Sequence, residues 1–208
     1  MSAAGSIDGL RFGPISARAV HVAIDMQVVF ADHKDWGAAT THQILPQVAR
    51  IAGHRPARTV FTRFLPPKSL TDLTGQWHAF YRRWPQVLAE SGNSALFDLL
   101  PILKRFAPPA KVVDKQIYSA FEAPDFAPAL RELAADTLIF TGVETDVCVL
   151  ATAIGAIDRG YRTILISNAL ASGSDEGHAA ALASVYPRFD QQIELIDTET
   201  LLREWKKP

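Results

Sequence analysis

One stretch of the chain decides its fold: Asp136-Thr137-Leu138-Ile139-Phe140-Thr141-Gly142-Val143-Glu144-Thr145-Asp146-Val147-Cys148-Val149. Its first half is apolar and β-branched, which predicts a buried strand, and the apolar residues from Leu150 to Ile157 predict a buried helix after it. Cys148, the only cysteine, therefore falls in the first turn of a helix that follows a strand. The free backbone N–H groups and the helix dipole at that position favour a thiolate over a thiol. We therefore interpret Cys148 as a nucleophile rather than a structural cysteine.

The same alternation of strand and helix extends along the rest of the chain. Short apolar, β-rich runs predict strands at 19–25, 59–63, 111–115, 137–142, 162–167 and 192–196. Helical patterns fall near 41–53, 125–135, 146–159, 175–186 and 198–206. This alternation implies right-handed crossovers and a parallel sheet that helices cover on both faces. The strands lack polar alternation, as expected when both faces are buried. We therefore predict a three-layer α/β/α fold.

The length and composition narrow the class of protein. A chain of 208 residues suits one α/β domain, so we expect a single domain over 1–208 with a flexible N-terminal segment at 1–16. The net charge of -1 and the lack of a basic run argue against nucleic acid or a charged membrane surface as the partner. No apolar run approaches the ~20 residues of a spanning helix, and the start lacks the apolar core of a signal peptide. A single cysteine allows no internal disulfide, so we expect the reducing cytoplasm.

Three reactive side chains fall where a sheet of this kind binds its ligands. In an open α/β sheet, ligands lie beyond the carboxyl ends of the strands. Asp25 closes the first predicted strand, Lys115 closes the third, and Cys148 opens the helix after the fourth. A cysteine can attack an amide carbonyl, and an aspartate can take the thiol proton and later protonate the leaving nitrogen. A nearby lysine would hold the carboxylate and favour the thiolate, while backbone N–H groups receive the oxyanion.

Three motifs carry a resemblance to a known family: Ile24-Asp25-Met26-Gln27-Val28-Val29-Phe30, Asp114-Lys115-Gln116-Ile117-Tyr118-Ser119-Ala120-Phe121 and Thr141-Gly142-Val143-Glu144-Thr145-Asp146-Val147-Cys148-Val149. In this order and spacing they resemble the isochorismatase-like cysteine hydrolases, and the strand pattern matches from about 17 to 197. The resemblance implies a six-stranded parallel sheet of order 3-2-1-4-5-6. It implies a catalytic triad of Asp25, Lys115 and Cys148, and a cis peptide at Val143–Glu144. The backbone N–H groups of Glu144 and Cys148 would then form the oxyanion hole, and a homodimer or homotetramer is expected.

The resemblance also implies a reaction class. Members of this family hydrolyse amides, carbamoyl groups or, in isochorismatase itself, a vinyl ether. Because the vinyl ether reaction does not need the thiol, Cys148 favours hydrolysis of a C–N bond in a small amide, ureido or carbamoyl compound. A thioester on Cys148 would form and release ammonia or an amine. Two alternatives remain open: an isochorismatase-type hydrolase that does not use the thiol, and a non-catalytic α/β binding protein.

The sequence departs from the nicotinamidase branch of the family after the second predicted strand. That branch carries an Asp-x-His metal motif there, whereas this chain reads Thr62-Arg63-Phe64-Leu65-Pro66-Pro67-Lys68. The six histidines, at 21, 33, 42, 54, 78 and 178, show no pairing typical of a metal site. We therefore expect a reaction without a metal or another cofactor.

Candidate substrate-binding residues come from the loops that follow the predicted strands: Gln27, Phe30, Trp36, Tyr118, Phe121 and Glu144. Gln27 would hold either Asp25 or the substrate, and the role of the Glu144 side chain is open. Trp77, Tyr81 and Trp84 fall at helical spacing. This aromatic stripe is compatible with core, with a subunit interface, or with a lid that gives the substrate a stacking wall.

Overall fold

The computed structural model describes residues 6–88, 92 and 94–206. It contains a six-stranded sheet in the order β3-β2-β1-β4-β5-β6, and every neighbouring pair is parallel. The strands are β1 (Val20–Ile24), β2 (Thr59–Phe64), β3 (Lys111–Lys115), β4 (Thr137–Val143), β5 (Arg162–Ala171) and β6 (Ile193–Ile196). The predicted fold, strand order and strand positions are confirmed. β5 differs most from its prediction, because it continues past residue 167 to Ala171.

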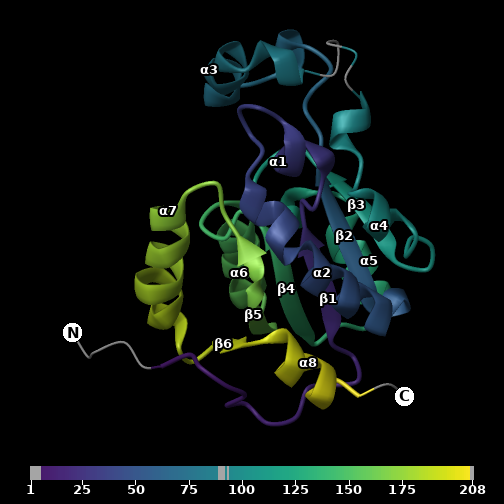
Figure 1. Cartoon of the computed structure of the whole chain (residues 1–208), viewed down its shortest axis with the longest axis vertical. Helices are drawn as coiled ribbons and strands as arrows, with labels where there is room; N and C mark the ends of the chain where they lie inside the picture. The colour runs from purple at the N-terminus through teal and green to yellow at the C-terminus, as the bar shows by residue number, and fades with distance from the viewer. Residues whose placement is uncertain (1–5, 89–91, 93, 207–208) are drawn as a thin grey trace.

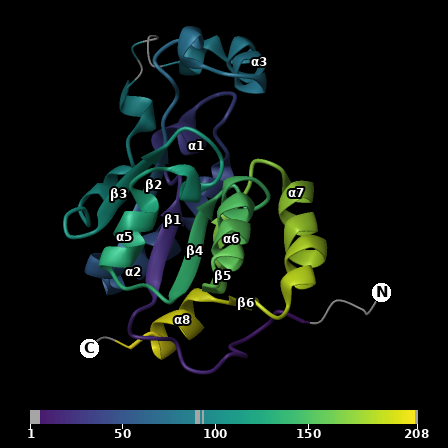
Figure 2. The same ribbon diagram turned by 180° about the vertical axis from the view of Figure 1, so that it is seen from behind.

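Helices cover both faces of the sheet (Figures 1 and 2). The helices are α1 (Val28–Asp32), α2 (Ala39–His54), α3 (Gln76–Arg83), α4 (Pro101–Lys104), α5 (Phe126–Glu132), α6 (Cys148–Asp158), α7 (Asp175–Ala180) and α8 (Thr198–Glu204). Figure 1 shows α2 and α8 on one face, and Figure 2 shows α5 and α6 on the other. The helix predicted at 175–186 is interrupted: a π-helical turn, Ala181–Val185, follows α7, and a 3-10 turn with a proline in its first turn comes next. Proline lacks the N–H that would continue an α-helix.

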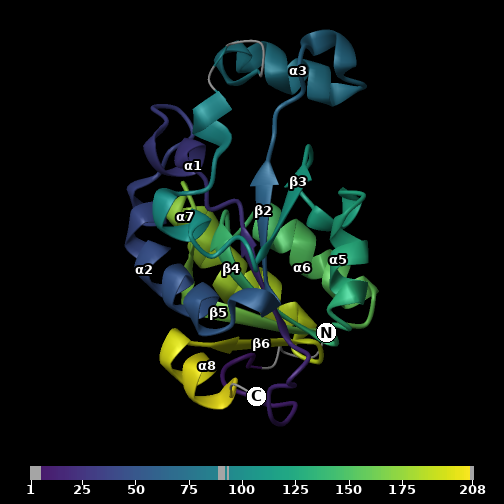
Figure 3. The ribbon, with the colours of Figure 1, turned by 90° about the vertical axis from the view of Figure 1, so that its right-hand side faces the viewer.

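The chain leaves the sheet between β2 and β3 and forms a separate layer. We call the described residues of this segment, 65–88 and 94–98, the cap; it carries α3 beyond the carboxyl end of β2 (Figure 3). The cap has its own apolar cluster, in which Tyr81 is fully buried. Trp77 packs on Tyr118 with ring centroids 5.0 Å apart. The aromatic stripe predicted at helical spacing is therefore a helix that packs over the loops at this edge of the sheet.

Close contact between β1 and β4 depends on Gly142. Its φ is 106°, and a Cβ built on it would lie 2.1 Å from the carbonyl oxygen of Ile24. We expect Gly142→Ala to lower the free energy of unfolding by about 2–5 kcal/mol, since the substitution adds both left-handed strain and a backbone clash. Urea denaturation measures this loss. Gly160→Ala is the control, because Gly160 also has a positive φ but a Cβ there meets nothing within 4 Å. Equal losses in the two variants would contradict a role for the β1–β4 contact.

The start of the described chain is packed against the sheet rather than detached from it. The amide of Leu195 donates to the Ile7 carbonyl at 2.6 Å, and the amide of Gly9 donates to the Leu195 carbonyl at 2.8 Å. Ile7 is only 3% exposed. Within the predicted N-terminal segment 1–16, Ile7 and Gly9 therefore pair with the edge strand β6, and the flexibility of the segment remains a prediction. Residues 1–5 lie outside the described part of the chain. Within the described residues, no helix is both long enough and apolar enough to span a membrane.

Candidate active site

Asp25 leaves the end of β1 with an unusual backbone. Its φ is 51°, which is uncommon for a residue other than glycine and often marks a functional position. Thr62, on the neighbouring β2, fixes the residue from both sides. The Thr62 hydroxyl donates to Asp25 Oδ1 at 2.6 Å and accepts from the Asp25 amide at 3.1 Å. The carboxylate of Asp25 is thereby held in one orientation below the loops.

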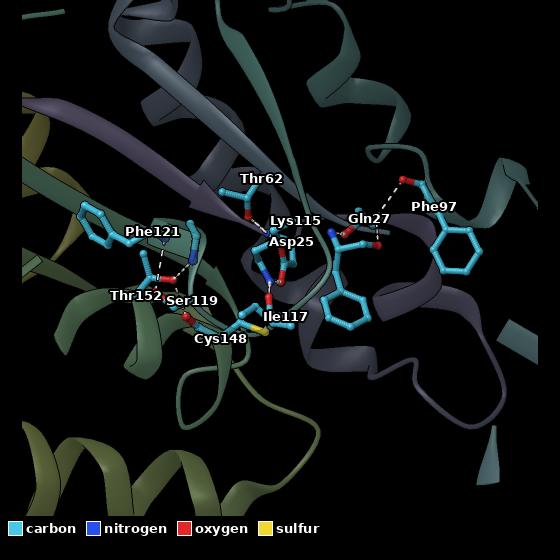
Figure 4. Close-up of polar contacts among 12 residues, drawn as sticks. Asp25, Gln27, Thr62, Phe97, Lys115, Ile117, Ser119, Phe121, Cys148 and Thr152 are labelled. Atoms are coloured by element: carbon cyan, nitrogen blue, oxygen red, sulfur yellow. Dashed lines mark hydrogen bonds and ion pairs between the residues drawn. The ribbon is translucent and has the colours of Figure 1, made fainter. Parts of the chain in front are cut away.

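The structure brings Asp25, Lys115 and Cys148 together, although they come from three separate parts of the chain (Figure 4). Lys115 Nζ lies 2.6 Å from Asp25 Oδ2 and 3.4 Å from Cys148 Sγ. The ammonium also donates to the carbonyl of Ile117 at 3.2 Å and lies 5.0 Å from the centre of the Phe64 ring. The side chains of Lys115 and Asp25 are fully buried. A buried ammonium thus bridges a carboxylate and a thiol, which is an arrangement suited to proton transfer between them.

Cys148 is the first residue of α6, as predicted, and its side chain is buried. Burial raises the pKa of the thiol, the charge of Asp25 raises it further, and Lys115 opposes these effects. Desolvation next to a carboxylate thus opposes the thiolate that the helix start favours. For Lys115, burial lowers the pKa, but the charge of Asp25 and the hydrogen bonds to Asp25 and Cys148 raise it, and the net shift is upward. These directions favour a neutral thiol beside the Asp25–Lys115 ion pair.

This protonation state predicts how iodoacetamide reacts with the protein. Only the thiolate is alkylated, so a raised pKa makes alkylation slow at pH 7 and increasingly fast as the pH rises beyond 9. Because Cys148 is the only cysteine, intact mass reports this site alone. Asp25→Asn removes a charge that raises the pKa of the thiol, so this variant should react faster than the wild type at every pH below 9. A wild-type rate that levels off below pH 7 would show that the thiolate is already formed.

The loop between β4 and α6 carries the residues predicted to form the oxyanion hole. The peptide bond between Val143 and Glu144 is cis, as the resemblance implies. Val147 is the N-cap of α6, so the N–H of Cys148 belongs to the first turn, where helix N–H groups have no partner within the helix. Glu144 Oε1 accepts a hydrogen bond from the amide of Gly173 at 3.0 Å. The role of the Glu144 and Cys148 amides toward an oxyanion remains a prediction.

Above the thiol lies a pocket of about 490 Å³. Four of the predicted substrate-binding residues line it together with Cys148: Phe30, Trp36, Tyr118 and Glu144. Trp84 of the aromatic stripe and the neighbouring Phe80, both in the cap, also line the pocket, while Tyr81 belongs to the apolar cluster of the cap. The remaining lining residues are Asp35, Gly37, Phe64, Asp146, Val147, Ser172, Gly173 and Ser174.

Gln27 does not have its predicted role. Its side-chain amide donates to the carbonyls of Phe64 at 3.1 Å and Phe97 at 2.7 Å, and its oxygen accepts from the Phe64 amide at 2.7 Å. Figure 4 shows the side chain directed toward Phe97. Gln27 is fully buried, is absent from the pocket lining, and ties the end of β1 to β2 and the cap through these backbone groups.

Phe121 is also misassigned by the prediction. It packs edge-on against Phe126 at 4.9 Å between ring centroids, and Arg159 lies 4.4 Å above its ring. It belongs to the apolar cluster beneath α6 and is absent from the pocket lining. The Ser119 hydroxyl accepts from the Phe121 amide at 3.3 Å and starts a turn. This turn directs the ring into the core.

Sequence reasoning missed three polar residues of the site: Thr62, Asp35 and Asp146. Thr62 lies inside the predicted second strand, and only the neighbouring β1 shows that its hydroxyl meets Asp25. Asp146 stands two residues before the cysteine within the quoted motif, which was a usable signal. It lines the pocket and accepts a hydrogen bond from the Ser172 hydroxyl at 2.6 Å. Within the described residues, no three His, Cys, Asp or Glu side chains are grouped so that they could hold a metal ion.

Comparisons with known proteins agree with this fold and site. The family model of the isochorismatase domain matches residues 19–199, and the chain therefore belongs to the isochorismatase family. A solved cysteine hydrolase from Pseudomonas syringae pv. phaseolicola 1448A is 26% identical, with a TM-score of 0.75 and a match that covers 93% of this chain and 95% of that chain.

Two curated relatives match shorter segments. An isochorismatase family protein of Bacillus subtilis is 36% identical over 116 residues, which are 54% of this chain and 63% of that protein. The maleamate amidohydrolase of Pseudomonas putida is 30% identical over 92 residues, which are 44% of this chain and 43% of that enzyme. The matched segments thus span less than two thirds of either relative.

Proposed function

We propose that this protein is a cysteine hydrolase that cleaves the C–N bond of a small amide, ureido or carbamoyl compound. One observation carries the proposal: a buried ammonium lies 2.6 Å from Asp25 Oδ2 and 3.4 Å from Cys148 Sγ at the base of a pocket. Membership of the isochorismatase family and the likeness to a cysteine hydrolase and to a maleamate amidohydrolase support it. A buried thiol beside a carboxylate has no evident structural purpose in a binding protein.

In the proposed reaction Asp25 and Cys148 act together. Asp25 takes the thiol proton as the sulfur attacks the carbonyl carbon, because the raised pKa of the thiol leaves little thiolate beforehand. The N–H groups of Glu144 and Cys148 bind the developing oxyanion. The C–N bond then breaks, Asp25 gives its proton to the leaving nitrogen, and ammonia or an amine departs from a thioester.

The second half of the proposed reaction repeats these steps with water. Asp25 removes a proton from a water molecule that attacks the thioester carbonyl, and the thiolate leaves and regains a proton. Lys115 keeps its charge throughout, since neighbouring negative groups raise its pKa. It holds Asp25 in place and stabilises negative charge on the sulfur in both halves. The products are a carboxylic or carbamic acid and ammonia or an amine.

The proposal is tested by ammonia release from a panel of primary amides, ureido and carbamoyl compounds, combined with intact mass after acid quenching. We expect at least one compound to release ammonia and to leave an acyl adduct on the wild-type chain. The adduct should be absent after prior alkylation of Cys148. Turnover that survives complete alkylation would favour the isochorismatase-type reaction without the thiol instead. The homodimer or homotetramer and the cytoplasmic location expected from the sequence remain part of the proposal.

A further inference from the structure

The pocket above Cys148 has an aromatic wall. Phe30 and Trp36 are stacked with ring centroids 6.1 Å apart and an interplanar angle of 7°. Trp36 also meets Trp84 edge-on at 6.1 Å and Phe80 at 5.9 Å. Phe80 and Trp84 of the cap, Phe30 of α1 and Trp36 of the loop after α1 thereby form one aromatic part of the pocket lining. Aromatic faces attract organic cations through the negative charge of their π systems.

The charged lining of the same pocket is acidic. It contains the carboxylates of Asp35, Glu144 and Asp146, and none of the described residues that line it is Lys, Arg or His. Lys115 lies beneath the pocket, where its charge is paired with Asp25. At the rim, Lys34 is 3.8 Å from Asp35 but its side chain is 81% exposed, so water screens its charge. Arg83 lies 5.2 Å above the Trp84 ring. The charged residues that line the pocket itself are therefore all acidic.

Two of these carboxylates occupy positions that adjacent glycines leave open. A Cβ on Gly173 would lie 2.8 Å from Glu144 Oε1, and a Cβ on Gly177 would lie 2.1 Å from Asp146 Oδ2. The Gly173 amide donates to Glu144 at 3.0 Å, and the Ser172 hydroxyl donates to Asp146 at 2.6 Å. The acidic groups are thus held against the pocket wall by specific contacts.

Burial and, to a smaller extent, neighbouring negative charge disfavour the charged form of Glu144, and a cationic ligand would offset both. Burial raises the pKa of Glu144, the hydrogen bond from Gly173 opposes this, and the charges of Asp146 and Asp25 raise the pKa further. A positive charge between the aromatic rings and the carboxylates would be attracted by both. A carboxylate on the substrate would instead face three groups of its own sign at close range.

We infer that the substrate is a primary amide attached to a small organic cation, which the aromatic wall and the carboxylates of Asp35, Glu144 and Asp146 hold while Cys148 attacks the amide. This inference rests on the proposed function, since it names the substrate class of the same site. A quaternary ammonium or a protonated amine separated from the carboxamide by one or two carbons fits a pocket of about 490 Å³.

The test compares two amides of the same shape that differ in charge. Betaine amide carries a trimethylammonium group, and 3,3-dimethylbutanamide has carbon in place of the charged nitrogen. Succinamate supplies the anionic case. We expect the wild type to show a kcat/KM at least about tenfold higher for betaine amide than for its neutral isostere, and still lower activity with succinamate. Calorimetry with Cys148→Ala should show the same order of affinity without turnover.

Variants of the acidic residues test whether the carboxylates cause the preference for the cationic amide. Glu144→Gln keeps an oxygen that accepts from the Gly173 amide but removes the negative charge. Asp35→Asn likewise replaces a carboxylate at the rim by a neutral amide of the same shape. Each should reduce the ratio of betaine amide to 3,3-dimethylbutanamide by about three- to tenfold, because the neutral amide does not sense the lost charge. Asp32→Asn is the matched control. It removes an exposed carboxylate from α1 that bonds His42 and does not line the pocket, so the ratio should stay unchanged.

The inference and the proposed function fail in different ways. Equal affinity of Cys148→Ala for the two isosteres, no binding of either at millimolar concentration, or tighter binding of succinamate would overturn the cationic substrate whatever the enzyme hydrolyses. Preferential binding of betaine amide without ammonia release from any amide would leave the cation site standing and overturn the hydrolase.

Discussion

Replacing Cys148 by alanine should reduce amide turnover by about 10⁴- to 10⁶-fold, the range found when a covalent nucleophile is removed from a hydrolase. The sulfur is the group proposed to form the thioester, and the described residues that line the pocket offer no second thiol. Ammonia release measures the loss, and intact mass after acid quenching should show no acyl adduct. Asp25→Asn should lose a similar amount, because it removes the base that takes the thiol proton.

The control for this prediction is a neighbouring residue that has no proposed role in the reaction. Val149 is fully buried in the same helix, next to Cys148. Val149→Ala should lower the free energy of unfolding by about 1–3 kcal/mol through lost packing but change kcat only a few-fold. If Cys148→Ala kept turnover within tenfold of the wild type, the thioester mechanism would be excluded. If Val149→Ala were as inactive as Cys148→Ala, the loss would reflect damage to α6 rather than the missing sulfur.

Replacing Lys115 by methionine should lower the free energy of unfolding by about 3–5 kcal/mol, a large part of the stability of a domain of this size. The loss is large because the partner of Lys115, the carboxylate of Asp25, is also buried. The side chains of Lys115 and Asp25 are both fully buried and 2.6 Å apart. Without the ammonium, the carboxylate keeps the hydrogen bond from Thr62 but no compensating charge. Urea denaturation at pH 7 measures the loss.

The double variant Asp25→Asn/Lys115→Met separates stability from function. Removing both charges removes the uncompensated carboxylate, so the double variant should be more stable than Lys115→Met and approach the wild type. It should nevertheless be inactive, because it lacks the proposed base. Additive losses in the double variant would show that the two charges do not stabilise each other, and would contradict the uncompensated carboxylate as the cause of the loss. An active double variant would show that proton transfer uses another group.

The chain order of strands and helices was predictable because it depends on local properties. Apolar runs of five to seven residues and helical spacing of apolar residues recur independently of the rest of the chain. The strand-end positions of Asp25 and Lys115 follow from the same patterns, and parallel strands place their carboxyl ends at one edge. The strand order came instead from the resemblance of three motifs, since periodicity does not say which strands pair.

The misassigned residues show that local sequence patterns do not predict the direction of a loop side chain. Gln27 and Phe121 follow strand ends, just as Phe30 and Tyr118 do. The side-chain amide of Gln27, however, bonds to backbone groups of residues 64 and 97. The ring of Phe121 packs in the core under α6. The direction of a loop side chain depends on turns and partners far away in the chain. Periodicity carries no information on either.

By itself, the sequence determined the α/β architecture, the edge of the sheet where chemistry is expected, and the three residues placed at that edge. Only the tertiary structure decided the protonation of Cys148, because burial and the distance to Asp25 and Lys115 arise when segments 123 and 33 residues apart meet. It also decided the acidic and aromatic character of the pocket. That character combines residues of the cap with residues that follow β1, β3, β4 and β5, which are far apart along the chain. Desolvation and electrostatic interactions act through space, whereas the patterns that define strands and helices act along the chain.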